Sequence, residues 1–216
     1  MLVAVSKVDV TKVMIWNDFY KQKKGVAVWG GERADFFLEL IKKYKLSGGL
    51  LLDIGCGVGD KSIFFAKNGF ETVGIDISEV AITEAREKAK SAGAKSEFFV
   101  GDFSALAKIK EIAARRYDVV LDLLSSQFLI GDEKSSFIEQ LAEVQASGGY
   151  YFFETFGKES EDDPMPGVEE WIKKIAVSPQ QVEVLYGSYF EILERIVHKS
   201  GNQQGASVHF YVMRRK

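Results

Sequence analysis

A short apolar run that opens into three closely spaced glycines constrains this chain more than any other stretch. Residues 50–54 read Leu-Leu-Leu-Asp-Ile, and glycines follow at positions 55, 57 and 59. The apolar run has the composition of a strand covered on both faces of a parallel sheet. Glycines lack a Cβ atom, so the backbone can turn sharply and lie directly against a ligand with its N–H groups pointing outward. The stretch therefore predicts a strand, a tight loop and the start of a helix, with main chain touching a flat or polar ligand.

Length and composition favour one globular unit with a substantial core. The chain has 216 residues, of which 46% are hydrophobic, and such a length buries enough apolar surface to fold alone. The 28 Lys and Arg residues face 31 Asp and Glu residues, for a net charge of -3. This balance gives no general attraction for nucleic acid or an anionic membrane, and it favours a small-molecule or protein substrate.

The sequence also carries signals about location and redox chemistry. A lone cysteine, Cys56, cannot form an intrachain disulfide. No stretch approaches the roughly 20 apolar residues that span a bilayer, and the N-terminus lacks the features of a signal peptide. We therefore expect a cytoplasmic protein with no membrane partner.

Predicted strands and helices alternate along the rest of the chain, the pattern of a doubly wound α/β fold with a mostly parallel sheet and helices on both faces. Two closing runs, residues 189–198 and 207–213, are separated by a glycine-bearing turn and predict an antiparallel hairpin. The other strands are predicted at residues 72–76, 98–100, 117–122 and 150–154. With the first strand and the two closing runs, they make a seven-stranded sheet. The helices are predicted at 32–45, 61–69, 78–93, 106–113, 137–144 and 178–187.

Two segments depart from this alternation. Residues 1–33 mix aromatic side chains between Trp16 and Trp29 with lysines, and we interpret them either as a helix packed on the core or as a flap over a ligand. Residues 156–178 are acidic and contain prolines, which predicts a mobile loop or an insertion. The chain thus divides into an N-terminal aromatic segment, 1–33, and a Rossmann-like domain, 34–216.

Acidic residues end several of the predicted strands. Asp76 ends the second strand, where a carboxylate can accept hydrogen bonds from both hydroxyls of a ribose. Asp102 ends the third strand and precedes Phe103, and this pair is placed to bracket an adenine. Alternate glycines alone are a weak signal, because dinucleotide-binding folds use them too. With the acids, they predict a nucleoside across the first three strands.

From about residue 33 to 216 the chain resembles the class I S-adenosylmethionine-dependent methyltransferases. The run 53–59 matches the first motif of that family, whose loop lies under the methionine part of the cofactor, and 74–78 matches the second, whose acid holds the ribose. Residues 101–103 resemble the adenine-edge motif, and 117–122 the strand beside the transferred methyl group. The resemblance implies S-adenosyl-L-methionine as the cofactor. The residues that it assigns to cofactor binding are Asp53, Gly55, Cys56, Gly57, Gly59, Asp76, Ile77, Gly101, Asp102, Phe103 and Asp122.

Within that family, the N-terminal segment and residues 178–193 look like the small-molecule branch around the tellurite-resistance and thiopurine methyltransferases. This resemblance implies methyl transfer to a small-molecule acceptor. It makes the N-terminal segment part of a lid, with Trp29 near the cofactor and Arg33 as a partner for the cofactor's carboxylate. No short motif identifies the acceptor or an oligomeric state.

Two other functions are alternatives to methyl transfer. A nicotinamide-dependent oxidoreductase also carries its glycine loop after the first strand, but its third glycine or alanine comes three residues after the second. Here that position is Asp60. The other alternative is a catalytically silent protein that keeps the fold and binds S-adenosylmethionine or another nucleoside without transferring a methyl group.

A methyl sulfonium is already activated, so a general base is optional. By position, Asp122 and Glu154 are the candidates to take a proton from the acceptor, and loop capping is the alternative role for both. His198 and His209 fall in the predicted hairpin, which we expect to lie away from the ligand-bearing strand ends. Cys56 has no base nearby in the sequence and is expected to be inert. No His or Cys spacing supports a metal site.

Overall fold

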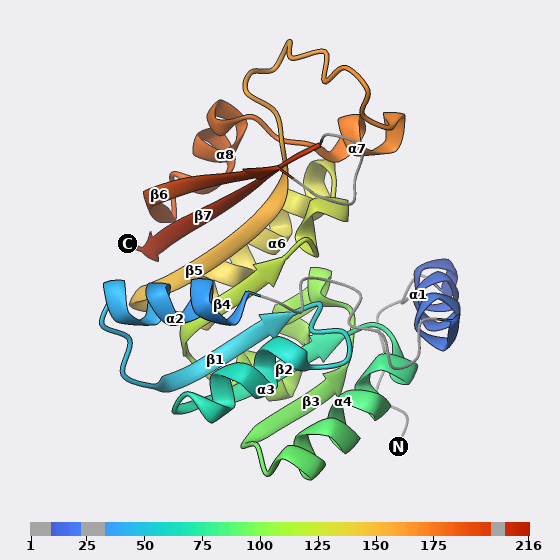
Figure 1. Cartoon of the computed structure of the whole chain (residues 1–216), viewed down its shortest axis with the longest axis vertical. Coiled ribbons are helices and arrows are strands. Elements are labelled where there is room, and N and C mark those ends of the chain that lie inside the picture. Colours follow the sequence, from blue (N-terminus) through green and yellow to red (C-terminus); the bar gives the residue numbers. More distant parts are fainter. Residues whose placement is uncertain (1–9, 23–32, 200–205) are drawn as a thin grey trace. The chain divides into compact units, whose positions relative to one another are not determined.

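The computed structural model describes residues 10–22, 33–199 and 206–216, and the chain divides into two compact units, residues 1–103 and 104–216. The first unit contains three strands and four helices within its described residues (Figure 1). Its strands are β1 (Gly49–Ile54), β2 (Phe70–Asp76) and β3 (Ser96–Val100), and its helices are α1 (Val10–Gln22), α2 (Ala34–Lys43), α3 (Asp60–Lys67) and α4 (Glu79–Ala92).

The three strands of the first unit form a parallel sheet in the order β3-β2-β1. Leu52 of β1 lies opposite Val73 of β2, and Gly74 of β2 lies opposite Phe98 of β3. Leu52 and Val73 are fully buried, as expected for strands whose apolar run does not alternate with polar residues. The carboxyl ends of these parallel strands carry the loops of the predicted site.

Helix α4 begins and ends where its sequence predicts. The Ser78 hydroxyl oxygen accepts a hydrogen bond of 3.2 Å from the Ala81 N–H, and Gly93 ends the helix at φ 62°. The inner face of α4 places Ile82 and Ala85 against Phe98 of β3. Capping and amphipathic spacing therefore fix α4 on the sheet directly after Asp76.

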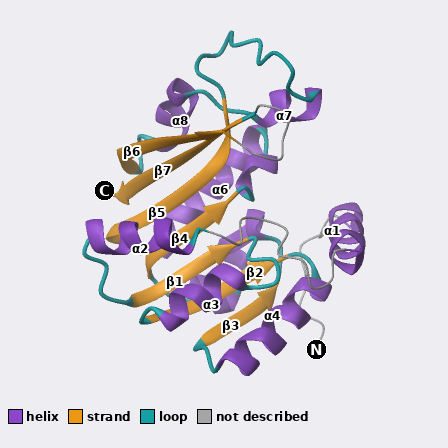
Figure 2. Cartoon of the chain, viewed as in Figure 1, coloured by secondary structure: helices purple, strands orange, loops and turns teal. Residues whose placement is uncertain are grey.

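Within its described residues the second unit contains four strands, and Figure 2 draws all strands in orange. Strands β4 and β5 are parallel, and β7 runs antiparallel to both β5 and β6. Its strands are β4 (Tyr117–Leu123), β5 (Gln145–Gly157), β6 (Phe190–Lys199) and β7 (Ser207–Arg215), and its α-helices are α5 (Lys110–Ala113), α6 (Gly131–Val144), α7 (Glu170–Ile175) and α8 (Pro179–Tyr186). The strand order of the chain is β3-β2-β1-β4-β5-β7-β6. The predicted mostly parallel, seven-stranded sheet with an antiparallel hairpin is confirmed.

Helix α8 starts with a capping box. The Ser178 hydroxyl accepts from the Gln181 N–H, the Gln181 side chain accepts from the Ser178 N–H, and Pro179 occupies the first helical position. The helix ends in Tyr186, whose ring packs on Phe153 of β5 at a centroid distance of 5.2 Å. Aromatic packing of this kind forms the core of the second unit.

Three local predictions need correction. The expected helix over 106–113 is a 3₁₀ segment, Phe103–Lys108, followed by the single-turn helix α5. Strand β5 begins at Gln145 rather than at 150 and continues to Gly157. Segment 156–178 therefore begins inside a strand, and it also contains helix α7. The extension of β5 to Gly157 follows from its ladder with β7, so tertiary pairing overrides the local pattern there.

Candidate functional site

The loop after β1 turns through three left-handed glycines. Their φ angles are 63° at Gly55, 53° at Gly57 and 79° at Gly59, a region that other residues rarely adopt. The Cys56 N–H donates to the Ile75 carbonyl oxygen at 3.0 Å, which ties the loop to β2. The sequence prediction of a tight loop between strand and helix is confirmed, and α3 starts directly after Gly59.

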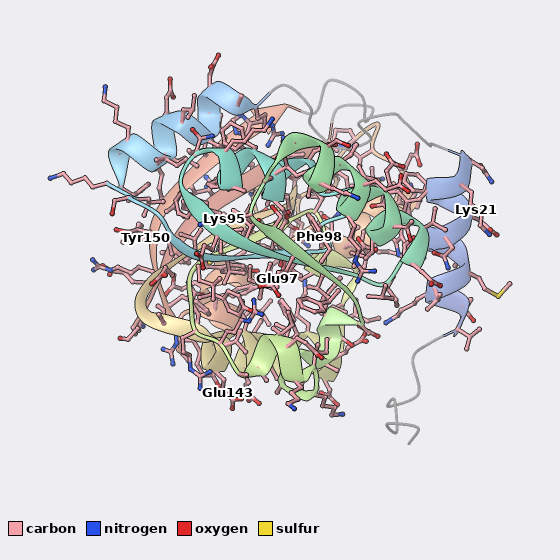
Figure 3. All side chains as sticks on the ribbon, turned by 90° about the horizontal axis from the view of Figure 1, so that it is seen from below. Lys21, Lys95, Glu97, Phe98, Glu143 and Tyr150 are labelled. Atoms are coloured by element: carbon pink, nitrogen blue, oxygen red, sulfur yellow. The ribbon has the colours of Figure 1, made fainter. Side chains whose placement is uncertain are left out.

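The glycines serve different contacts. A Cβ atom built on Gly57 would lie 2.6 Å from the Tyr20 hydroxyl oxygen, and one on Gly59 would lie 2.8 Å from the Phe98 ring. Phe98 (labelled in Figure 3) is a core residue, so Gly59 permits close packing of helix and sheet. Gly57 instead permits a close approach to the loop's backbone, as a ligand-binding loop requires.

Asp76 joins the end of β2 to the glycine loop. Its Oδ2 accepts a 2.9 Å hydrogen bond from the Gly57 N–H, and its Oδ1 accepts a 2.8 Å bond from the Ser78 N–H. Burial raises the pKa of this carboxyl group to about 6, although the N–H donors oppose that rise. Each oxygen retains lone-pair capacity beyond these bonds, which suits the two hydroxyl groups of a ribose.

Asp53 links β1 to helix α3 on the other side of the glycine loop in sequence. It is buried at the end of β1, and its Oδ2 accepts a 2.6 Å hydrogen bond from the Ser62 hydroxyl of α3. Burial raises its pKa to about 7, although the Ser62 hydrogen bond opposes this rise. This contact fixes α3 against β1. Burial also raises the pKa of the neighbouring Cys56 thiol, which fits the expectation of an unreactive cysteine.

Helix α1 contributes two residues to this site that the sequence interpretation did not assign. Asn17 Oδ1 accepts hydrogen bonds from the Ser78 hydroxyl at 2.7 Å and from the Val80 N–H at 3.4 Å, which holds α1 beside the start of α4 (Figure 1). Tyr20 is buried over Gly57. Burial and the nearby Asp76 raise the pKa of its phenol, which stays protonated. The aromatic content of the segment signals Tyr20, whereas nothing in the sequence signals Asn17.

The predicted adenine-edge residues lie in the same unit. Strand β3 ends at Val100, and the Gly101 N–H donates to the Asp76 carbonyl oxygen at 2.9 Å. Asp102 and Phe103 follow in sequence, and Ile77 is half-buried beside Asp76. The fold thus brings the predicted ribose and adenine positions to neighbouring strand ends.

The two residues predicted to contact the cofactor from the lid are Trp29 and Arg33. Trp29 lies outside the described residues. Arg33 lies at the N-terminal end of α2, and its carbonyl oxygen accepts from the Phe37 N–H at 3.1 Å. A role for either side chain at the cofactor stays a prediction.

In the second unit, Asp122 organises the loop that follows β4. It is fully buried; its Oδ1 accepts from the Ser126 N–H at 2.9 Å and the Ser125 N–H at 3.3 Å, and the Tyr151 hydroxyl donates to its Oδ2 at 2.7 Å. Burial raises its pKa, although the hydrogen bonds and nearby Lys134 lower it. These contacts match the loop-capping alternative of the sequence interpretation.

Glu154 is the other predicted base. It is buried on β5, opposite Leu123 of β4 and Phe210 of β7. Proton transfer by either acid stays a prediction.

The placement expected for His209 is wrong. This residue is fully buried on β7 opposite Thr155, two positions before the end of β5 at Gly157. Because β7 starts where β5 ends, the antiparallel return brings His209 to a carboxyl strand end, the type of position that carries ligand loops in this fold. His198 pairs with Val208 at the same end of the hairpin.

Within the described part of the chain, no group of three or more His, Cys, Asp or Glu side chains could hold a metal ion. None of the helices in that part of the chain has the length and apolar character needed to cross a bilayer.

The strand order, reversed hairpin and glycine loop define the class I methyltransferase fold. Residues 51–149 match a family of methyltransferase domains. An uncharacterized methyltransferase of Schizosaccharomyces pombe, C750.03c, is 29% identical over 108 residues, which are 50% of this chain and 72% of that protein.

Solved structures share the fold at low identity. Magnesium protoporphyrin IX methyltransferase (ChlM) from Synechocystis PCC 6803 with bound S-adenosylmethionine has a TM-score of 0.73 and 18% identity over 100% of both chains. TehB from Haemophilus influenzae has a TM-score of 0.69 and 18% identity over 93% of this chain and 67% of TehB. Residues 51–149 thus form a methyltransferase domain, and the fold, the methyltransferase relatives and the structures with bound cofactor support a class I S-adenosylmethionine-dependent methyltransferase with S-adenosyl-L-methionine as its cofactor.

Proposed function

We propose that this protein transfers the methyl group of S-adenosylmethionine to a small-molecule acceptor and releases S-adenosylhomocysteine. The observation that carries the proposal is the hydrogen bond from the Gly57 N–H to the Asp76 carboxylate at the end of β2. It places a strand-end carboxylate beside a loop whose backbone is open to close approach at Gly57, where a Cβ atom would clash. The net charge of -3 favours a small acceptor over a nucleic acid. The likeness of the N-terminal segment to the small-molecule branch supports the same class of acceptor.

The residues of the first unit fit the cofactor. The loop over 55–59 would lie under its methionine part, Asp76 would accept hydrogen bonds from the ribose hydroxyls, and Ile77 with residues 101–103 would enclose the adenine. When bound, the cofactor supplies a methyl group on a positively charged sulfur, and the sulfur is the leaving group when the acceptor's nucleophile attacks the methyl carbon in line. The chain's contribution is to orient the reactants and exclude water. The buried Tyr20 ring over Gly57 serves the second purpose.

The acceptor's proton needs no dedicated base if it leaves to water after transfer. Asp122 and Glu154 remain the proposed proton acceptors, but Asp122 already accepts bonds from Tyr151 and two backbone N–H groups. We therefore propose that Asp122 primarily fixes the loop over 123–128 and that this loop shapes the acceptor pocket. The cytoplasmic location and the absence of nucleic-acid and membrane partners stay predictions of the sequence.

The test is calorimetric titration with S-adenosylmethionine, followed by assay of S-adenosylhomocysteine release over a broad panel of small amines, phenols, thiols and organic acids. Binding together with acceptor-dependent release supports the proposal. Binding without release on any acceptor supports the silent ligand-binding alternative. Binding of a nicotinamide dinucleotide in place of S-adenosylmethionine would support the oxidoreductase alternative.

A further inference from the structure

A group of titratable side chains in the second unit has no part in the proposed reaction. Arg195 of β6 and Tyr211 of β7 lie opposite one another, His209 is two positions from Tyr211, and Glu159 follows the end of β5 by two residues. We name these four residues the β5-end cluster. It lies at the carboxyl end of β5, where folds of this kind place their ligand loops.

The neighbours of His209 assign the nitrogen that carries its proton. Burial raises the pKa of Tyr211 to about 12, so its phenol keeps its proton, and its hydroxyl lies 3.4 Å from His209 Nδ1. Burial and the Arg195 guanidinium lower the pKa of His209, although Glu159 opposes this, and the neutral imidazole is favoured. Nε2 faces the Glu159 carboxylate, which can only accept, so the ring proton is assigned to Nε2 and Nδ1 is left to accept from the Tyr211 hydroxyl. His209 therefore presents an N–H donor on the side that faces Glu159.

Glu159 is held loosely by two donors. Its Oε1 lies 3.6 Å from His209 Nε2 and its Oε2 lies 3.5 Å from Arg195 Nη1, whereas charge-assisted hydrogen bonds are typically about 2.7–2.9 Å long. Within the described residues, Nε2 has no hydrogen-bond partner although the His209 side chain is 0% exposed. The Glu159 side chain is 63% exposed and that of Arg195 is 33% exposed. The buried His209 N–H and the partly exposed Arg195 guanidinium thus both face the solvent-accessible Glu159 carboxylate. Both contacts are longer than a full hydrogen bond.

The position of His209 is fixed by its surroundings. A Cβ atom built on Gly157 would lie 2.2 Å from the His209 ring, so only glycine allows the ring to lie on β5. The backbone of His209 is also held by the β5–β7 and β6–β7 ladders, opposite Thr155 and Val197. The donor is therefore preorganised, while the exposed Glu159 side chain can leave without disturbing the sheet.

We propose that the β5-end cluster is a carboxylate-binding site of the second unit, and that Glu159 is a stand-in which the ligand's carboxylate displaces. A carboxylate has two oxygens in one plane, and these match the division of the two Glu159 oxygens between His209 and Arg195. The ligand class is then a small organic acid.

The test uses benzoate as the probe and its neutral analogue benzamide as the matched ligand. The chain contains only two histidines, His198 and His209, so their imidazole NMR signals in the full-length protein are assigned with one variant each. We expect benzoate to shift the His209 signal saturably and benzamide to leave it unchanged. Glu159→Gln removes the competing carboxylate and should tighten benzoate binding by roughly tenfold, and Arg195→Gln should weaken it by at least about tenfold.

The controls come from the same two strands. Glu191 and Arg214 form an exposed ion pair on β6 and β7, and Glu191→Gln and Arg214→Gln should leave benzoate affinity unchanged. Arg195→Lys keeps the charge and is used if Arg195→Gln does not fold. The site is overturned if benzoate produces no saturable shift of His209, or if Glu159→Gln weakens binding. Titration with S-adenosylmethionine tests the proposed function separately, because the cofactor residues belong to the first unit.

Discussion

The backbone N–H of Gly57 donates a 2.9 Å hydrogen bond to Oδ2 of Asp76, which joins the glycine loop to the end of the neighbouring strand. The other oxygen of the same carboxylate accepts from the N–H of Ser78, whose hydroxyl caps helix α4. One buried carboxylate therefore fixes the loop, the strand end and the helix start before any ligand binds. Such preorganisation lowers the entropy cost of binding a nucleoside at this place.

Replacement of Asp76 by Ala should weaken S-adenosylmethionine binding by more than about tenfold, because a carboxylate that bonds ribose hydroxyls contributes roughly 1.5–3 kcal/mol. The strands and helix α4 should still form, since the β1–β2 and β2–β3 ladders and the Ser78 cap do not involve the Asp76 side chain. Calorimetry measures the affinity, and circular dichroism checks the fold. Asp60→Asn is the matched control, because Asp60 is an exposed aspartate at the start of α3 that pairs with Lys88. Equal affinity in Asp76→Ala and the parent protein would remove the ribose assignment.

The buried acids predict a particular pH dependence of stability. Burial raises the folded-state pKa of Asp53 to about 7 from an ordinary value of 3.8, so the folded state binds more protons than the unfolded state between these values. The contribution of this group to the free energy of unfolding is therefore complete below about pH 4 and is lost as the pH rises through 7. At 1.36 kcal/mol per pKa unit the loss is on the order of 4 kcal/mol.

Asp53→Asn tests this dependence. The variant cannot ionise at that position, so its Tm should fall less than that of the parent protein between pH 4 and 7.5, both measured without cofactor. Asp60→Asn should follow the parent curve, since Asp60 is exposed. Parallel curves for Asp53→Asn and the parent would mean that Asp53 is not the group responsible.

Much of the first unit follows from sequence alone for identifiable reasons. The apolar run before Gly55 has no polar alternation, Ser78 and Gly93 mark both ends of α4, and Asp76 lies where a strand must end. Each of these local signals determines where a strand or helix begins or ends, and the structure has each element where it is predicted. Pro179 with Ser178 predicts the start of α8 in the same manner.

The parts that the sequence did not predict depend on contacts between distant residues. Asn17 reaches Ser78 across 61 positions, and no local pattern announces such a bond. His209 arrives at the end of β5 because an antiparallel strand begins where a parallel strand finishes, so its place is decided by topology rather than by its neighbours. Asp122 lies at the predicted strand end, but its bond to Tyr151 shows only in the folded chain.

Gly57→Ala should reduce stability through two separable effects. The added Cβ would strain a backbone at φ 53° and would meet the Tyr20 hydroxyl oxygen at 2.6 Å. Gly93→Ala isolates the first effect, because Gly93 has φ 62° and nothing within 4 Å of a built Cβ. We expect about 1 kcal/mol of destabilisation in Gly93→Ala and a larger loss in Gly57→Ala, measured by denaturant unfolding.

The Tyr20 contact is then tested by a double-mutant cycle. Tyr20→Phe removes the hydroxyl and should restore part of the stability lost in Gly57→Ala, so the two changes should be non-additive. Additive effects would show that the ring does not lie over the loop in solution. The same set of variants should rank in the same order for S-adenosylmethionine affinity, since both residues belong to the proposed site.

Asn17→Ala should release helix α1 from the start of α4 and accelerate dissociation of S-adenosylmethionine. Asn17 Oδ1 accepts two hydrogen bonds there, and the loss of such a pair costs roughly 1–3 kcal/mol, or about 5- to 150-fold in the docking equilibrium. If α1 covers the cofactor, that change appears in the dissociation rate, which stopped-flow fluorescence measures with the tryptophan of α1, Trp16, as the reporter.

The control for this variant lies one residue away. Asp18 is exposed on the same helix, and among the described contacts its carboxylate pairs only with exposed Lys21, which Figure 3 labels, so Asp18→Asn should leave the dissociation rate unchanged. Faster dissociation in Asn17→Ala but not in Asp18→Asn would establish α1 as a cover for the cofactor. Equal rates in all three proteins would instead restrict α1 to packing on α4, and the bond between Asn17 and Ser78 would then contribute to stability alone.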